Sequence, residues 1–282
     1  MSGCLLRKAL LSALLLLMSL PLLGGRARPG SAFRGWDVFV IAGQSNAVGM
    51  SSEVTRAAPP TQPTLAYTLW DSWIRVEDPW IHRSPTVRVR VSSPWPSFAL
   101  RWVTLGRKVA LIASAKGGSC LVAGPAEWDP TSGPLYQRML DRVGQAGAEG
   151  HVKAVLWHQG ECDAQQWWND GTDPVQAQAL YKAGLETLAD AVARDLGAVL
   201  VAAPISLTRC RWSNPDCTAN PGPPAVKRIP VHDATLQAAA EHWNIVLGPL
   251  SDDLRHEPDN VHIHEVTLLG LRWADALQAA GL

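Results

Sequence analysis

The sequence has little of several features that commonly reveal function. It contains three tyrosines and three phenylalanines against thirteen tryptophans, and its 25 basic and 25 acidic residues cancel to a formal net charge of +0. It has no run of lysine and arginine, so it offers nucleic acid no electrostatic footprint. It also lacks the patterns Gly-x-x-x-x-Gly-Lys-[Ser/Thr], Gly-x-Gly-x-x-Gly and His-Glu-x-x-His. The common nucleotide-binding and zinc-helix motifs are therefore excluded, and we predict neither a cofactor nor a metal.

The N-terminal 32 residues differ in character from the rest of the chain. They carry four basic residues and no acidic one, and they include a 15-residue apolar stretch over residues 9–23. That length is typical of a signal-peptide core and short for a membrane span. We predict a signal peptide over residues 1–32, a secreted or periplasmic protein, and no stable membrane span after cleavage. An uncleaved signal anchor is the alternative.

Export changes how the cysteines are interpreted. Cys4 lies in the predicted signal peptide, which leaves Cys120, Cys162, Cys210 and Cys217. An even number in an oxidising compartment favours two disulfides, in one of three possible connectivities. Cys210 and Cys217 enclose a short loop, whereas Cys120 and Cys162 each follow a predicted strand that ends in glycine. Metal binding by the four is the alternative, although no close Cys-x-x-Cys pair supports it.

Apolar runs that resemble buried strands alternate with segments of helical period. The predicted strands are 37–42, 109–115, 152–157, 198–203 and 245–250, and the predicted helices are 135–148, 174–196, 231–243 and 264–280. This alternation predicts an α/β fold with three α/β/α layers and a mostly parallel central sheet. The strands are continuously apolar, as expected when helices cover both faces of the sheet. We predict one domain over residues 33–282, with a long excursion over 51–96.

Small polar clusters follow three of these strands. The first strand leads into "GQSN" around Ser45, the second into "KGGS", and the third into "WHQGECD", while "DNVH" comes late in the chain. In an open parallel sheet, ligands bind beyond the carboxyl ends of the strands. We therefore expect these clusters to meet at one edge.

The residue types in these clusters suit acyl transfer. A serine hydroxyl needs a base to become a nucleophile, and His262 can supply it. Asp259, three residues earlier, can orient the imidazole and stabilise its protonated form. The oxyanion of the tetrahedral intermediate needs hydrogen-bond donors. The candidates are the backbone N–H groups of Ser45 and Gly118 and the side-chain amide of Gln159.

Each assignment has a simpler alternative. Gly and Asn around Ser45 are ordinary turn residues, and His264 competes with His262 for the role of base. Asp259 can cap the last helix or the turn before it, and Gln159 can satisfy buried backbone groups. The coincidence of these residues at successive strand ends favours the catalytic interpretation.

Taken in order, the four motifs resemble the SGNH-hydrolase superfamily. Within it they are most similar to the sialate O-acetylesterase-like branch, which includes acetylxylan esterases of carbohydrate esterase family 6. The resemblance implies a flavodoxin-like fold and metal-independent ester hydrolysis, with Ser45 as nucleophile, His262 as base and Asp259 as orienting acid. It also implies that Glu161 supports the oxyanion hole, in which Gly118 and Gln159 join the Ser45 amide. Cys162 stands where the family usually has serine.

The many tryptophans bear on the substrate. Exposed indoles are platforms for sugar rings, and three tryptophans lie in segments close to the active edge: Trp167, Trp168 and Trp212. Packing is the alternative, and it is the prediction for three others within strands or helices: Trp157, Trp243 and Trp273.

The sequence therefore predicts a secreted serine esterase that removes acetyl groups from carbohydrates. Acetylated xylan or another plant polysaccharide and O-acetylated sialic acid are both candidate substrates. A carbohydrate O-acyltransferase and a non-catalytic carbohydrate-binding protein of the same fold are the alternatives.

Overall fold

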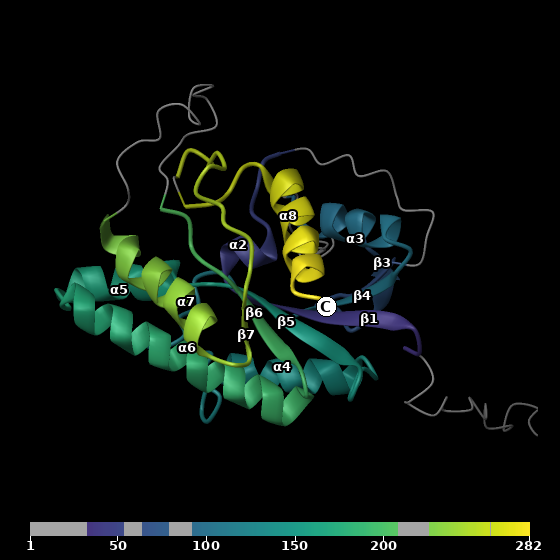
Figure 1. Ribbon diagram of the computed structural model, residues 1–282, viewed down its shortest axis with the longest axis horizontal. Coiled ribbons are helices and arrows are strands. Elements are labelled where there is room, and N and C mark those ends of the chain that lie inside the picture. Colours follow the sequence, from purple (N-terminus) through teal and green to yellow (C-terminus); the bar gives the residue numbers. More distant parts are fainter. Residues whose placement is uncertain (1–32, 54–63, 79–91, 208–225, 260) are drawn as a thin grey trace, which may run out of the picture.

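A seven-stranded sheet forms the centre of the protein in the computed structural model (Figure 1). The structure describes residues 33–53, 64–78, 92–207, 226–259 and 261–282. The strands, in chain order, are β1 (Trp36–Gly43), β2 (Thr64–Tyr67), β3 (Trp73–Arg75), β4 (Lys108–Ala113), β5 (Val152–His158), β6 (Val199–Ala203) and β7 (Ile245–Leu247). Their order across the sheet is β3-β2-β4-β1-β5-β6-β7, and every neighbouring pair is parallel except β2 with β3.

Helices cover both faces of this sheet, as Figure 1 shows. They are α2 (Ser45–Val48), α3 (Trp95–Thr104), α4 (Pro134–Gln145), α5 (Glu161–Asp170), α6 (Pro174–Leu196), α7 (Ile229–Glu241) and α8 (Val266–Ala279), with a short 3-10 turn, η2 (Val226–Arg228). Helices α4, α6 and α7 pack on one face, and α3 and α8 on the other. The predicted three-layer α/β/α fold with a mostly parallel sheet is confirmed.

Strand β1 shows why the central strands are apolar throughout. Val38, Val40 and Ala42 point into the core under α4, α6 and α7, whereas Phe39 and Ile41 point into the core under α3 and α8. All five are fully buried, because successive side chains of a strand face opposite sides of a sheet that is covered on both.

The end of β1 requires glycine. Gly43 has a φ of +114°, and a Cβ at this position would lie 2.3 Å from the main-chain oxygen of His158 on the neighbouring strand. Only a residue without a side chain allows this close approach together with a positive φ. The chain therefore leaves the sheet sharply at Gly43, and Ser45 becomes the first residue of α2.

Some expectations from the sequence need correction. Helix α5 occupies the segment after β5, for which no helix was predicted, so Trp167 and Trp168 lie on a helix. Trp157 and Trp273 are buried as predicted, but Trp243 is 76% exposed, because α7 ends at Glu241 and leaves the indole in the turn before β7.

Two predictions about the N-terminus concern a segment that the structure leaves undescribed. The predicted signal peptide, residues 1–32, lies outside the described residues. Within the described part of the chain, no helix is both long and apolar enough to cross a membrane.

Candidate active site

A cavity of about 490 Å³ opens at the carboxyl ends of the parallel strands. Four of the predicted site residues line it together: Ser45 after β1, Gly118 after β4, Glu161 after β5, and His262 from the segment before α8. The sheet order explains this convergence, because β4 and β5 are the two neighbours of β1. Among the described residues, no group of three or more His, Cys, Asp or Glu side chains is arranged to hold a metal ion.

His262 and Asp259 form a local pair. The Nδ1 atom of His262 lies 2.5 Å from Oδ2 of Asp259, and Oδ1 of Asp259 accepts hydrogen bonds from the backbone N–H groups of Val261 and His262 at 2.8 and 3.0 Å. Burial alone would raise the pKa of Asp259, but these hydrogen bonds outweigh it and lower the pKa below its usual value. An ionised carboxylate only accepts, so it fixes the proton on Nδ1 and leaves Nε2 as the basic nitrogen.

His264 belongs to a different network. Its Nδ1 lies 2.9 Å from Oε1 of Glu257, and the same carboxylate accepts the backbone N–H of Ser52 at 2.6 Å. Burial opposes ionisation of Glu257, but the bonds from Ser52 and His264 lower its pKa. His262 lines the cavity with Ser45, whereas His264 does not line it.

Asn46 connects the serine to the segment that carries the histidine. Its Nδ2 donates to Oε1 of Glu161 at 2.6 Å and to the main-chain oxygen of Val261 at 3.1 Å, and its Oδ1 accepts the N–H of Ile263 at 3.0 Å. These bonds hold the residues on both sides of His262. Sequence analysis missed this role, since the only signal was the position of Asn46 directly after Ser45.

Gln159 lies behind the cavity rather than in its wall. The side chain is fully buried, and its Nε2 donates to the main-chain oxygen of Ser119 at 2.9 Å and to Oδ2 of Asp163 at 2.6 Å. The hydroxyl of Tyr181 lies 2.8 Å from its Oε1. In this arrangement Gln159 satisfies buried polar groups, which was the simpler of its two interpretations, and its predicted role as an oxyanion donor stays a prediction.

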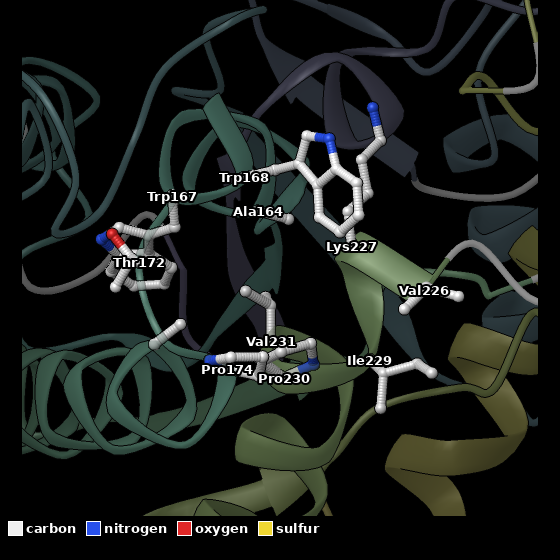
Figure 2. A pocket seen from close by; sticks show the side chains of 11 residues that line it. Ala164, Trp167, Trp168, Thr172, Pro174, Val226, Lys227, Ile229, Pro230 and Val231 are labelled. Carbon is white, nitrogen blue, oxygen red and sulfur yellow. The ribbon is translucent and has the colours of Figure 1, made fainter. Parts of the chain in front are cut away.

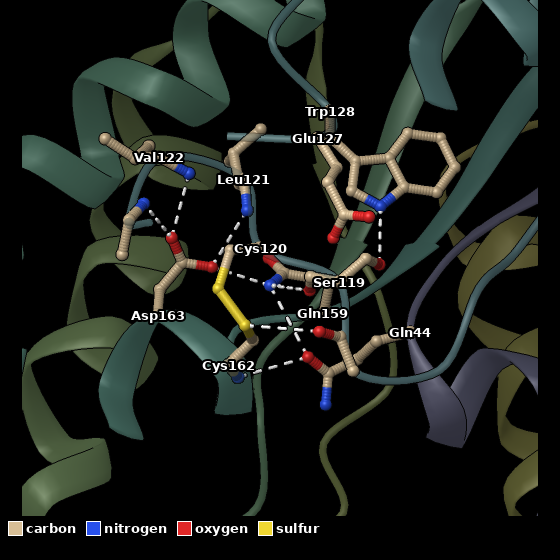
Figure 3. The surroundings of a disulfide bond; sticks show 12 residues. Gln44, Ser119, Cys120, Leu121, Val122, Glu127, Trp128, Gln159, Cys162 and Asp163 are labelled. Atoms are coloured by element: carbon tan, nitrogen blue, oxygen red, sulfur yellow. Dashed lines mark hydrogen bonds between the residues drawn. A yellow bond between two sulfur atoms is a disulfide. The ribbon is translucent and has the colours of Figure 1, made fainter. Parts of the chain in front are cut away.

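Asp163, which sequence analysis did not single out, organises the loop after β4. Its carboxylate accepts the backbone N–H groups of Leu121, Val122 and Ala123 at 3.0, 2.8 and 2.7 Å (Figure 3). Three converging N–H groups satisfy a fully buried carboxylate that would otherwise be costly. The loop that contains Gly118 is therefore tied to α5.

A disulfide joins the same two segments (Figure 3). Cys120 and Cys162 are bonded, with their Cα atoms 5.1 Å apart, so one of the two predicted disulfides is present and its pairing is now assigned. The backbone N–H of Cys162 donates to Oε1 of Gln44 at 3.1 Å. Cys210 and Cys217, expected to form a second bridge, lie outside the described residues.

The tryptophans near the site divide by exposure. A second cavity, of about 240 Å³, lies between α5 and the start of α7 and is lined almost entirely by apolar side chains (Figure 2). Trp168 is 59% exposed at this cavity, whereas Trp167 is buried and packs edge-on against Tyr181. Trp168 thus has a free face for a ligand. Trp212 lies outside the described residues.

Comparison with known families assigns the chain to a family. The family described as "Carbohydrate esterase, sialic acid-specific acetylesterase" matches residues 35–279. Because the match covers most of the chain, the protein belongs to this family, and it is accordingly a carboxylic ester hydrolase. The expected resemblance to the sialate acetylesterase type of carbohydrate esterase is confirmed. No curated protein matches the chain.

Solved structures share the fold. A protein of Arabidopsis thaliana matches with a TM-score of 0.65 and 22% sequence identity, over 86% of this chain and 98% of that one. A carbohydrate acetylesterase of Xanthomonas citri matches with a TM-score of 0.59 and 16% identity, over 87% of this chain and 57% of that one. At these identities the similarity concerns the fold alone.

Proposed function

We propose that the protein is a secreted serine esterase that hydrolyses O-acetyl esters on carbohydrates through an acetyl-enzyme on Ser45. The observation that carries this proposal is the meeting of Ser45 and His262 in one cavity, with His262 bonded to Asp259 on its far side. Membership of a carbohydrate esterase family supports an ester of a sugar as the substrate.

In the first half of the reaction, Nε2 of His262 takes the proton from Oγ of Ser45 as Oγ forms a bond to the acetyl carbon. The electron pair of the carbonyl moves onto its oxygen, and Asp259 stabilises the protonated imidazole. The carbonyl then re-forms, and the sugar oxygen leaves with the C–O electron pair and receives the proton from His262. The acetyl group stays on Ser45.

In the second half, water replaces the sugar. His262 takes a proton from the water as its oxygen attacks the acetyl carbon, and the tetrahedral intermediate collapses to release Oγ of Ser45, which regains the proton. Acetic acid leaves and loses its remaining proton to solvent as it becomes acetate, and the site returns to its initial state. In a transferase, a sugar hydroxyl would replace this water.

The oxyanion formed in both halves needs donors. The N–H of Ser45 belongs to the first residue of α2 and has no acceptor within the helix. Gly118, with a φ of +70°, lines the same cavity. These two backbone groups are the proposed donors, with Gln159 as the side-chain donor that the sequence predicts.

Two further features support an exported enzyme that acts on carbohydrate. The Cys120–Cys162 disulfide suits an oxidising compartment. The exposed indole of Trp168, on the same helix that lines the cavity with Glu161 and Cys162, is the proposed platform for a sugar ring. Acetylated xylan and O-acetylated sialic acid are both proposed substrates.

The test is acetate release by the purified protein and by Ser45→Ala. The substrates are 4-nitrophenyl acetate, acetylated xylan and O-acetylated sialic acid. We expect release that depends on Ser45 from the small ester and from one of the two carbohydrates, which would then be assigned as the substrate class. Acetylated product on adding an acceptor sugar would favour the transferase. Equal release by Ser45→Ala, or carbohydrate binding without release, would contradict the esterase.

A further inference from the structure

The side chain of Gln44 is held in one orientation next to Ser45. Gln44 lines the cavity, and its Oε1 accepts the backbone N–H of Cys162 at 3.1 Å, with Nε2 of Gln159 at 3.5 Å on the same side. The backbone N–H of Cys162 can only donate, so it determines which end of the Gln44 amide is oxygen. The Nε2 end of Gln44 consequently points away from Cys162 and Gln159, as Figure 3 shows.

The Nε2 atom of Gln44 is available for a ligand. In the described part of the chain it makes no hydrogen bond, although the residue is only 3% exposed. The Nε2 of Gln159 differs, since the main-chain oxygen of Ser119 and the carboxylate of Asp163 already take its two hydrogens. For Gln159 to act, it would have to leave a buried carboxylate, which is costly.

We propose that Gln44, and not Gln159, supplies the side-chain hydrogen bond to the oxyanion formed at Ser45. The inference rests on the proposed esterase function. Gln159 then acts behind Gln44: it binds Asp163 and Ser119, and so holds the loop after β4 and the start of α5, whose Cys162 N–H fixes the Gln44 amide.

The chemistry requires such a donor only while negative charge is present. When Oγ of Ser45 bonds to the acetyl carbon, the carbonyl electron pair moves onto the oxygen, which then accepts hydrogen bonds from the N–H groups of Ser45 and Gly118 and from Nε2 of Gln44. A donor that strengthens only in the transition state raises kcat and leaves KM nearly unchanged. Removal of one such donor lowers kcat by about 10²–10³-fold in other acyl-transfer enzymes.

Two substitutions separate donation from support. Gln44→Glu keeps an oxygen for the N–H of Cys162 but replaces the Nε2 donor with a second oxygen. Gln44→Met adds no charge but removes both the donor and the acceptor. Loss of the donor is the one change that the two variants share. Gln159→Met, in turn, removes the donor that the sequence predicts.

The experiment measures kcat and KM for 4-nitrophenyl acetate, together with Tm and the intact disulfide of each variant. We expect both Gln44 variants to lose about 10²-fold or more in kcat at similar KM. Gln159→Met should lower Tm, and it should lower kcat by less than either Gln44 variant does.

Normal kcat in either Gln44 variant would overturn the proposal, as would a loss of kcat in Gln159→Met that exceeds the loss in both. Ser45→Ala, measured in parallel, distinguishes failure of the proposed esterase function from failure of the inference about Gln44. If that variant turns over like the wild type, the esterase function itself fails. If turnover requires Ser45 but not Gln44, only this inference fails.

Discussion

His262 and His264 lie two positions apart, and their hydrogen-bond partners determine which of them can act as the base. His262 is bonded to Asp259 and faces the cavity, whereas His264 is bonded to Glu257 and lies in the network of Ser52. Sequence alone favoured His262 through its spacing from Asp259 but left His264 as a competing base, because both have the same residue type. The distinction depends on which way each side chain points in the folded loop.

This difference gives a direct test by substitution. We expect His262→Ala to lower kcat for 4-nitrophenyl acetate by at least about 10³-fold, because the reaction loses its general base. His264→Ala is the matched control and should keep kcat within several-fold. Steady-state kinetics of the two purified variants checks this, and the opposite pattern would show that the base is misassigned.

The site residues fall into two groups, those whose roles can be predicted from the sequence and those whose roles cannot. The positions of Ser45 and Gly118 at the site were predictable because both follow predicted strand ends, and that of His262 because a histidine three residues after Asp259 suits a base. The roles of Gln44, Asn46 and Asp163 were not, because each depends on hydrogen bonds to residues distant in the chain. Such bonds leave no periodic pattern in the sequence.

At the scale of elements, hydrogen bonds from Asn46, and not pairing of strands, hold the segment of His262 next to α2. We call these bonds the Asn46 tether. Asn46 on α2 bonds Val261 and Ile263, the neighbours of His262, and Glu161 at the start of α5 holds Asn46 in turn. Helix α2, the start of α5 and the segment around His262 are thus held together by the side chain of Asn46.

Removal of this tether should misplace the base without removing it. We expect Asn46→Ala to lower kcat by about 10–100-fold, since small displacements of reacting groups are costly. Asn169→Ala is the matched control, because Asn169 lies on the exposed side of α5 and its side chain accepts a hydrogen bond from Gln165. Kinetics and Tm of both variants check this. Wild-type kcat in Asn46→Ala would show that the tether is dispensable.

Elements themselves were predicted unevenly. Helix α6 matches its predicted range, 174–196, since its apolar residues recur at helical spacing over many turns. Helix α5 was missed, because its sequence "ECDAQQWWND" is short and mostly polar. Strands β2 and β3 were missed because they are only four and three residues long.

At the scale of the whole molecule, stability should depend on pH through buried histidine. His256 is fully buried, and burial, followed by the nearby positive charge of Arg228, lowers the pKa of His256 to about 4 from 6.5. Burial also lowers the pKa of His158. Between about pH 4 and pH 6.5, His256 takes up a proton in the unfolded chain but not in the folded chain. Stability is therefore fully present above about pH 6.5 and lost as the pH falls toward about 4.

The size of this effect follows from the pKa difference. His256 alone should cost up to about 3 kcal/mol of unfolding free energy over that range. Urea denaturation at about pH 8 and about pH 5 should show about 2 kcal/mol of it, because pH 5 lies between the pKa of 6.5 in the unfolded chain and about 4 in the folded chain. His256→Phe, which does not titrate, should show a smaller decrease between the two conditions. An equal decrease in both proteins would mean that His256 is not the group responsible.

The central claim is that Ser45 is the nucleophile of this carbohydrate esterase family member. The most direct measurement is labelling with an organophosphonate, followed by intact mass and peptide mapping, with esterase activity measured in the same samples. The account predicts one phosphonyl group per chain, located on Ser45, with activity lost in proportion to labelling and no label on Ser45→Ala. Labelling at another residue, or activity that survives complete labelling of Ser45, would contradict it.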